Sequence, residues 1–183
     1  MRAPTATLAR VKYVMRQDLI SFGDDFTIKD DDGNVRYEVD GKAFTLLREK
    51  LAFKDVTGKE LAFIRERLIA LTPSYEILRD GECVAVVKKD LINLFRCGFT
   101  VDVPGPDDLE AQGNLLDHEY TFTRGSRVVA TVSKKWFRLT DTYGVEIADD
   151  QDPVLILASA VVIDMICHAD ASKQKKPAPP PAS

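Results

Sequence analysis

The feature that most constrains the fold is one apolar segment, Pro153–Cys167, which follows a long run of strand-like sequence. Asp152 is a suitable N-cap residue, and Pro153 suits the first helical turn because its missing N–H would have no partner there. The segment is apolar on nearly every side, so it must be surrounded by protein or by lipid. It is shorter than the roughly 20 apolar residues that span a bilayer, and it carries Asp164. We therefore predict a helix buried inside a soluble β-rich domain, with no transmembrane segment.

Before this helix, short β-type runs alternate with Gly or Asp turns from Val11 to Ala148. Counting them gives about twelve candidate strands, at a spacing typical of sandwiches and barrels. Glu60–Leu71 also fits a helical period, but its alternation favours a strand. The turn signals predicted to connect paired strands are Asp40-Gly41 (with Phe44 beginning the second strand), Thr57-Gly58-Lys59, Asp80-Gly81 and Gly125-Ser126.

A weak internal repeat relates Tyr75–Val101 to Tyr120–Ile147 at an offset of about 45 residues. Each unit contains a predicted hairpin, a Lys-Lys corner and a further strand. Similar units on one closed sheet would leave no exposed edges, which favours a barrel. Pro104–Asp117 lies outside the repeat and is interpreted as a long acidic surface loop, anchored by Leu115-Leu116.

The chain of 183 residues fits one domain, with 45% apolar and 30% charged residues. We assign residues 1–10 to a flexible N-terminus, 11–170 to the barrel domain and 171–183 to a disordered Lys/Pro-rich tail. The net charge of −4 with interspersed signs argues against a nucleic-acid partner. The cysteines lack CxxC spacing, which indicates reduced thiols and a cytoplasmic location. The three cysteines are Cys83, Cys97 and Cys167. Of these, Cys83 and Cys167 lie in apolar runs and are interpreted as small buried side chains.

From roughly Lys12 to Ala169 the chain resembles the LURP-one-related family, which is grouped with the tubby C-terminal domain and the phospholipid scramblases. The residues that carry the resemblance are Gly113-Asn114, His118–Tyr120, Val129-Ala130, Ser133–Phe137, Asp141–Val145 and Asp152, Leu155, Ala158, Ile163 and Asp164. The resemblance implies a twelve-stranded antiparallel barrel around a central hydrophobic C-terminal helix. Tubby domains bind phosphoinositides. Scramblases carry a cysteine cluster and a calcium-associated segment, neither of which this sequence contains, so scrambling is not implied.

Motifs for conventional catalysis are missing from the sequence, which contains no GxSxG, Walker A, GxGxxG or HExxH pattern. Asp30–Asn34 resembles a calcium loop, but Ile28 and Val39 occupy ligand positions, so a polar hairpin turn is the better interpretation. We expect no enzyme activity, no metal and no cofactor. His168 is expected to contact the carbonyls at the end of the helix rather than to act as a base.

Asp164 needs an explanation of its own, because a carboxylate inside an apolar helix is costly unless it is paired or near an opening. One interpretation is a structural pair at the end of the barrel. The other is a barrel mouth, lined by Asp164 and His118, at which a ligand enters. Trp136 and Tyr143 are expected to be packing residues of the same rim or core.

The best candidates for recognition are two lysine pairs, Lys88-Lys89 and Lys134-Lys135, at equivalent positions of the repeat. Arginines that could extend a basic surface are Arg65, Arg67, Arg96 and Arg138. Such a surface would attract an anionic phospholipid or membrane, at about 1 kcal/mol for each basic residue; the alternative is that the lysines only keep the edges soluble.

The sequence thus predicts a non-catalytic binding module for anionic lipid headgroups or for a protein partner, located in the cytoplasm or peripherally on a membrane. Two alternatives remain at this stage. One is a small-molecule carrier or cryptic enzyme that uses the barrel mouth, and the other is a structural scaffold protein.

Overall fold

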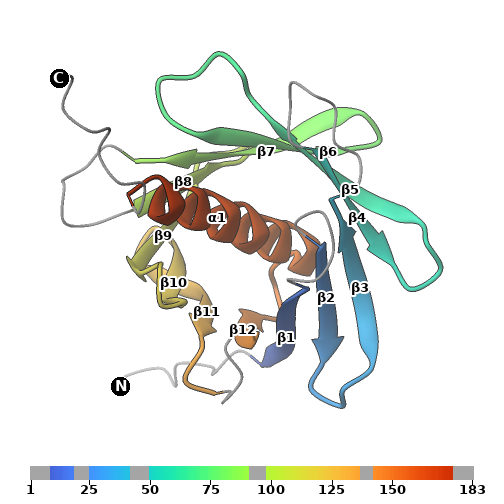
Figure 1. Cartoon of the computed structure of the whole chain (residues 1–183). Helices are drawn as coiled ribbons and strands as arrows, with labels where there is room; N and C mark the ends of the chain where they lie inside the picture. Colours follow the sequence, from blue (N-terminus) through green and yellow to red (C-terminus); the bar gives the residue numbers. More distant parts are fainter. Residues whose placement is uncertain (1–8, 19–24, 42–49, 91–97, 137–141, 175–183) are drawn as a thin grey trace, which may run out of the picture.

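The structure of the protein is a computed structural model that describes residues 9–18, 25–41, 50–90, 98–136 and 142–174. Twelve antiparallel strands form one closed barrel, in which each strand pairs with its neighbours in sequence and the first pairs with the last (Figure 1). The strands are β1 (Arg10–Asp18), β2 (Asp25–Asp30), β3 (Val35–Asp40), β4 (Lys50–Asp55), β5 (Glu60–Glu66), β6 (Ser74–Arg79), β7 (Glu82–Lys89), β8 (Gly98–Asp102), β9 (Leu109–Asn114), β10 (Glu119–Arg124), β11 (Arg127–Ser133) and β12 (Thr142–Ala148). The predicted mainly β, closed antiparallel barrel of about twelve strands is confirmed.

Helix α1 (Pro153–Gln174) fills the barrel, as the apolar segment predicts (Figure 1). Every residue from 156 to 167 is buried, so no side of this stretch faces water. The carboxylate of Asp152 accepts hydrogen bonds from the N–H groups of Val154 (3.0 Å) and Leu155 (3.2 Å), which confirms the predicted N-cap. By length and composition, Pro153–Asp170 could cross a membrane, with a mean hydropathy of 1.7; in this fold it is mostly enclosed by the strands.

The core forms between the helix and the inward-facing side chains of the strands. Alternation along each strand sends one side chain inward and the next outward. In β10, for example, Tyr120 and Phe122 are buried whereas Thr121 and Thr123 between them are partly exposed. Burying one large apolar side chain is worth about 1.5–3 kcal/mol, so the helix and the barrel lining stabilise each other.

Turn chemistry explains several connections. Asp80 and Gly81 have φ angles of 50° and 85°, the left-handed pair that a two-residue hairpin turn requires, and they join β6 to β7 as predicted. The tight hairpin predicted at Asp40-Gly41 is wrong, because β3 pairs with a strand that begins only at Lys50. The Gly41 N–H instead donates to the carboxylate of Asp25 on β2. Phe44 lies outside the described residues.

Two further expectations need correction. The segment Pro104–Asp117 is not a loop throughout, because it contains β9, which pairs with both β8 and β10. Leu115 is buried, as an anchor should be, but Leu116 is exposed. The strand predicted over Glu60–Leu71 ends at Glu66.

The domain limits also shift. Arg10 belongs to β1, and α1 continues to Gln174, into the segment assigned to the tail. Residues 1–8 and 175–183 lie outside the described part of the chain. Cys167 is buried as expected, whereas Cys83 is exposed near the β6–β7 turn; Cys97 is not among the described residues.

Two ion pairs orient the barrel around the helix. Arg79, at the end of β6, pairs with Asp152 at 2.5 Å and so places the β6–β7 turn where the helix begins. Lys89, at the end of β7, pairs with Asp170 and so places that strand end where the helix finishes. We call these the N-end and the C-end of the barrel.

Candidate functional site

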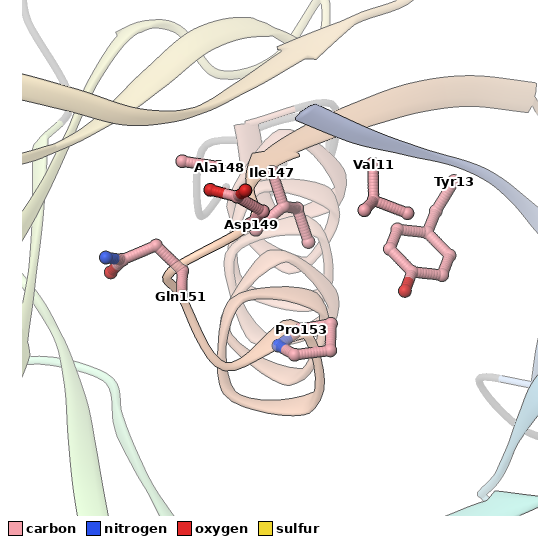
Figure 2. A pocket seen from close by; sticks show the side chains of 7 residues that line it. All are labelled: Val11, Tyr13, Ile147, Ala148, Asp149, Gln151 and Pro153. Carbon is pink, nitrogen blue, oxygen red and sulfur yellow. The ribbon is translucent and has the colours of Figure 1, made fainter. Parts of the chain in front are cut away.

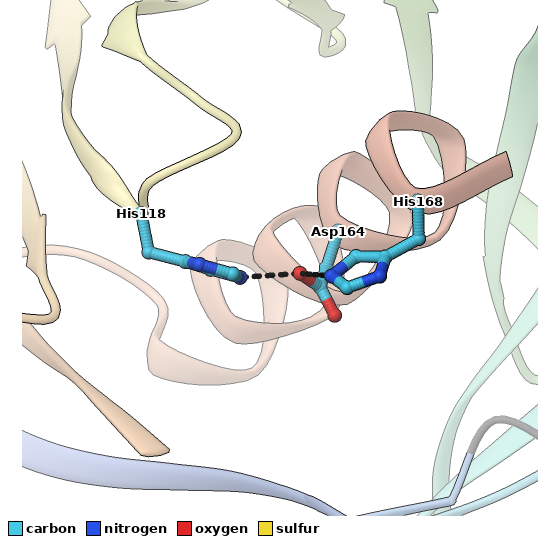
Figure 3. Close-up of side chains that lie close together, drawn as sticks. All are labelled: His118, Asp164 and His168. Carbon is cyan, nitrogen blue, oxygen red and sulfur yellow. Dashed lines mark hydrogen bonds and ion pairs between the residues drawn. The ribbon is translucent and has the colours of Figure 1, made fainter. Parts of the chain in front are cut away.

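Three polar side chains meet near the C-end (Figure 3). Asp164 and His168 lie four residues apart on α1, so helix geometry places them on one face. His118 comes from the turn between β9 and β10 and points toward the same carboxylate. Ligand atoms from all three residues lie within 4.8 Å of one another. We call this group the His-Asp-His cluster.

The turn that presents His118 has an unusual backbone. His118 has a φ of 52°, a left-handed conformation that non-glycine residues seldom adopt. Just before it, Gly113 has a φ of 143°, and a Cβ there would lie 2.5 Å from the carbonyl oxygen of Glu119. Only glycine fits this close approach. The His118 N–H donates to the Leu115 carbonyl at 3.2 Å, which closes the turn.

Asp164 is the centre of the cluster and has a side chain only 2% exposed. Its Oδ1 atom is hydrogen-bonded to Nε2 of His118, and Nε2 of His168 lies 3.4 Å from the same oxygen. The His118 ring stacks on Tyr143, with 4.3 Å between the ring centroids. His168 is the accessible member, with a side chain 55% exposed.

The two histidines determine the electrostatics of the carboxylate. Burial works to raise the pKa of Asp164, but the hydrogen bonds from His118 and His168 outweigh it and hold the pKa below its ordinary value. The phenols of Tyr120 and Tyr143 respond in the opposite direction. Burial, reinforced by the negative charge of Asp164, raises both of their pKa values well above the ordinary one.

Several buried polar atoms around this carboxylate have no hydrogen-bond partner in the described part of the chain. They are Asp164 Oδ2, His118 Nδ1, and the hydroxyl groups of Tyr120 and Tyr143. Most buried polar groups in proteins are hydrogen-bonded, so such a concentration needs an explanation.

Of the predicted site residues, Asp164 and His118 are brought together in a buried pair, a contact that both interpretations of Asp164 allow. The expectation that His168 lies at the end of the helix is wrong, because the helix continues to Gln174; its Nε2 lies 3.4 Å from Oδ1 of Asp164. Tyr143 is a core residue. Trp136 lies near the surface, 37% exposed, with the ammonium of Lys12 5.0 Å from its ring centroid.

The predicted lysine pairs both lie at the C-end, and most of their charges have partners. Lys88 pairs with Asp102 at 2.6 Å, and Lys89 pairs with Asp170. Lys135 lies 3.4 Å from Glu119, whose carboxylate also accepts the backbone N–H groups of Lys134 and Lys135. Of the candidate arginines, Arg65 and Arg67 both pair with Glu76, whereas Arg96 and Arg138 lie outside the described residues.

A group of exposed aliphatic residues that was not predicted from the sequence lies at this same end. The connection from β5 to β6 presents Leu68, Ile69 and Leu71, which we call the aliphatic tip; Ile69 is 95% exposed and Leu71 fully exposed. Leu116, in the β9–β10 turn, is also exposed. Isolated surface aliphatics are ordinary, but several at one end of a fold indicate a contact surface.

The N-end contains a small pocket beside the start of the helix (Figure 2). Its volume is about 70 Å³, well below the ~300–1,000 Å³ of pockets that bind drug-sized ligands. It is lined by Val11, Tyr13, Ile147, Ala148, Asp149, Gln151 and Pro153. The pocket shares no residue with the His-Asp-His cluster.

A closed barrel filled by one apolar helix defines the structural class of this protein. The LURP-one-related family model matches residues 11–164, and the chain belongs to that family. It is 33% identical over 160 residues to the uncharacterized protein YxjI of Bacillus subtilis (strain 168), covering 87% of this chain and 96% of that protein. The X-ray structure of protein AT5G01750 from Arabidopsis thaliana has the same fold, with a TM-score of 0.64 and 18% identity over 86% of this chain and 91% of that one.

Proposed function

We propose that this protein is a non-catalytic binding module that docks peripherally on an anionic membrane surface through the C-end of its barrel. The observation that carries the proposal is the aliphatic tip, Leu68, Ile69 and Leu71, exposed at the end where the lysine pairs lie. Peripheral binding to membranes combines two contributions, insertion of apolar side chains and attraction of basic residues to anionic lipids. This end of the barrel supplies both.

The ion pairs of the lysines are compatible with this role. The side chains of Lys88 and Asp102 are 40% and 48% exposed, and exposed pairs contribute only about 0–1 kcal/mol. A lysine can therefore exchange its carboxylate partner for a lipid phosphate at little cost. Because the net charge of the protein is −4, the attraction must come from this local surface, and the apolar contribution must be substantial.

The proposal makes the protein cytoplasmic and assigns it no reaction. The same exposed surface could instead bind a protein, so the experiment must separate the two partners. A carrier function has less support, because the apolar helix occupies the centre of the barrel.

The test is flotation of the purified full-length chain with neutral and anionic vesicles at about 20 mM and about 150 mM salt. We expect binding to anionic vesicles that weakens as salt rises. A variant with Leu68→Ser, Ile69→Ser and Leu71→Ser should lose most of this binding while its melting temperature stays unchanged. The double variants Lys88→Ala/Lys89→Ala and Lys134→Ala/Lys135→Ala should each reduce it.

The matched control is Val56→Ser, which removes an exposed aliphatic side chain from the β4–β5 turn at the N-end. Equal flotation of the tip variant and the wild type would overturn the proposal, as would no flotation under any condition. Stable capture of a protein by the wild type but not by the tip variant, without vesicle binding, would assign the surface to a protein partner.

A further inference from the structure

We infer that the His-Asp-His cluster is a binding site for one first-row divalent transition-metal ion, of which Zn²⁺ is the best representative. His118, Asp164 and His168 offer two imidazole nitrogens and one carboxylate oxygen within 4.8 Å of one another. The inference is independent of membrane docking and rests on the geometry of these three side chains and their immediate surroundings.

The arrangement is more than a carboxylate neutralised by one histidine. Hydrogen bonding to His118 alone would give buried Asp164 one partner. Here a second imidazole, that of His168, also directs its Nε2 to Oδ1, at 3.4 Å, while Oδ2 has no partner among the described residues. The two nitrogens and the oxygen lie within 4.8 Å of one another, and their side chains converge from both a helix and a turn (Figure 3).

The donor types select the class of ion. Imidazole nitrogen suits Zn²⁺ and its first-row neighbours, whereas Ca²⁺ and Mg²⁺ prefer oxygen ligands throughout. Three protein ligands leave the fourth position of a tetrahedral Zn²⁺ site open to water or to a group from outside. The exposed ring of His168 places one of the three ligands within reach of an ion from solvent.

The surrounding structure supports a site with a specific purpose. His118 is held at a φ of 52°, and strained backbone of this kind concentrates at functional sites. Its ring orientation is fixed by stacking on Tyr143. Unpartnered buried polar atoms of Tyr120, Tyr143 and Asp164 lie in the same region of the core.

The test is metal binding by the full-length chain after treatment with a chelator. Native mass spectrometry and titration calorimetry with Zn²⁺ should give one equivalent, and thermal melts should show stabilisation by Zn²⁺ but not by Mg²⁺ or Ca²⁺. Co²⁺ should give the visible absorption of a low-symmetry nitrogen–oxygen site, without a thiolate charge-transfer band. His168→Ala should weaken Zn²⁺ binding by more than about tenfold.

Two variants serve as controls. Asp170→Asn removes another acid at the same end of the helix, and Cys83→Ser removes the exposed thiol; both should bind Zn²⁺ like the wild type. Asp164→Asn should also abolish binding. Should it fail to fold, His168→Ala decides the question, because His168 is mostly exposed. The inference is overturned by Zn²⁺ binding unchanged in His168→Ala, by a thiolate band with Co²⁺, or by no binding at stoichiometric concentrations.

Discussion

Two aspartates of the helix region, Asp152 at the N-end and Asp164 near the C-end, are used differently. At the N-end, Asp152 employs both carboxylate oxygens: Oδ1 accepts the N–H groups of Val154 and Leu155, and Oδ2 pairs with Arg79. At the C-end, both histidines direct Nε2 to one oxygen of Asp164, and the other oxygen is unpartnered in the described structure. Both oxygens of Asp152 thus have partners, whereas Asp164 keeps one oxygen without a partner among the described residues.

Among the described residues, the larger exposed aliphatic side chains, those of leucine and isoleucine, lie at the C-end, whereas those exposed at the N-end are the smaller Val11, Val56 and Val128. The aliphatic tip lies at the C-end, together with both lysine pairs and a strained His118. Ion pairs fix the helix at both ends, and the C-end adds a buried charged cluster and an exposed apolar surface. Three predictions test this division.

The largest effect should come from a charge placed on an apolar face of the buried part of the helix. Ile163 is 1% exposed. In Ile163→Asp the new carboxylate is next to Asp164 in sequence, but it points to a different side of the helix from the two histidines. An unpaired buried charge has no compensation, so we expect loss of the folded state, at a cost above about 4 kcal/mol. Circular dichroism and thermal melting measure it. Ile163→Val should cost only about 1 kcal/mol, and a normal melt for Ile163→Asp would contradict the buried position.

The second effect concerns the helix start. Asp152→Ala removes the N-cap and the partner of Arg79, and we expect a loss of about 2 kcal/mol in the free energy of unfolding by urea. Asp152→Asn keeps a capping oxygen and should lose less. The control is Asp150→Ala, because Asp150 and Arg127 form an exposed pair whose loss should cost under about 0.5 kcal/mol. Equal losses in the Asp152→Ala and Asp150→Ala variants would show that Asp152 does not anchor the helix.

The smallest effect is a pH dependence at the N-end. Burial, followed by the neighbouring Tyr37, raises the pKa of Tyr13 from 10.0 to about 12. Because the pKa is higher in the folded state, the neutral Tyr13 phenol makes its full contribution to stability below pH 10, and this contribution is lost as the pH rises toward 12. Between pH 9 and pH 11 the ionisation of Tyr13 should lower the free energy of unfolding by about 1 kcal/mol. Tyr13→Phe should show a correspondingly smaller loss over that range in urea titrations, and an identical loss would mean that Tyr13 does not titrate there.

Much of the fold could be predicted because its signals are local. The apolar run after Asp152 indicates a buried helix by composition alone, and Asp80-Gly81 specifies its hairpin through left-handed backbone. Strand β9 escaped detection because Leu109–Asn114 contains Gly113 and only two buried side chains, Leu109 and Ala111. It is a strand because β8 and β10 pair with it, which no local pattern reveals.

The candidate site was predictable only in part. The carboxylate in an apolar helix identified Asp164 as unusual, and the i, i+4 spacing of Asp164 and His168 was a signal that could have completed the pair. The contact between His118 and Asp164 joins distant parts of the chain and depends on a turn at positive φ. The aliphatic tip was absorbed into a predicted strand, because an apolar run carries no information about where pairing stops.

The position of the helix in the chain has a consequence for how the protein is made. All twelve strands leave the ribosome before residue 153 does, and their inward faces are apolar. Until the helix is synthesised, the strands have nothing to enclose, and pairing of β1 with β12 joins the two most distant strands. Nascent chains therefore pass through a stage with exposed apolar strands, which are prone to aggregate, and a message truncated before Pro153 should yield insoluble product.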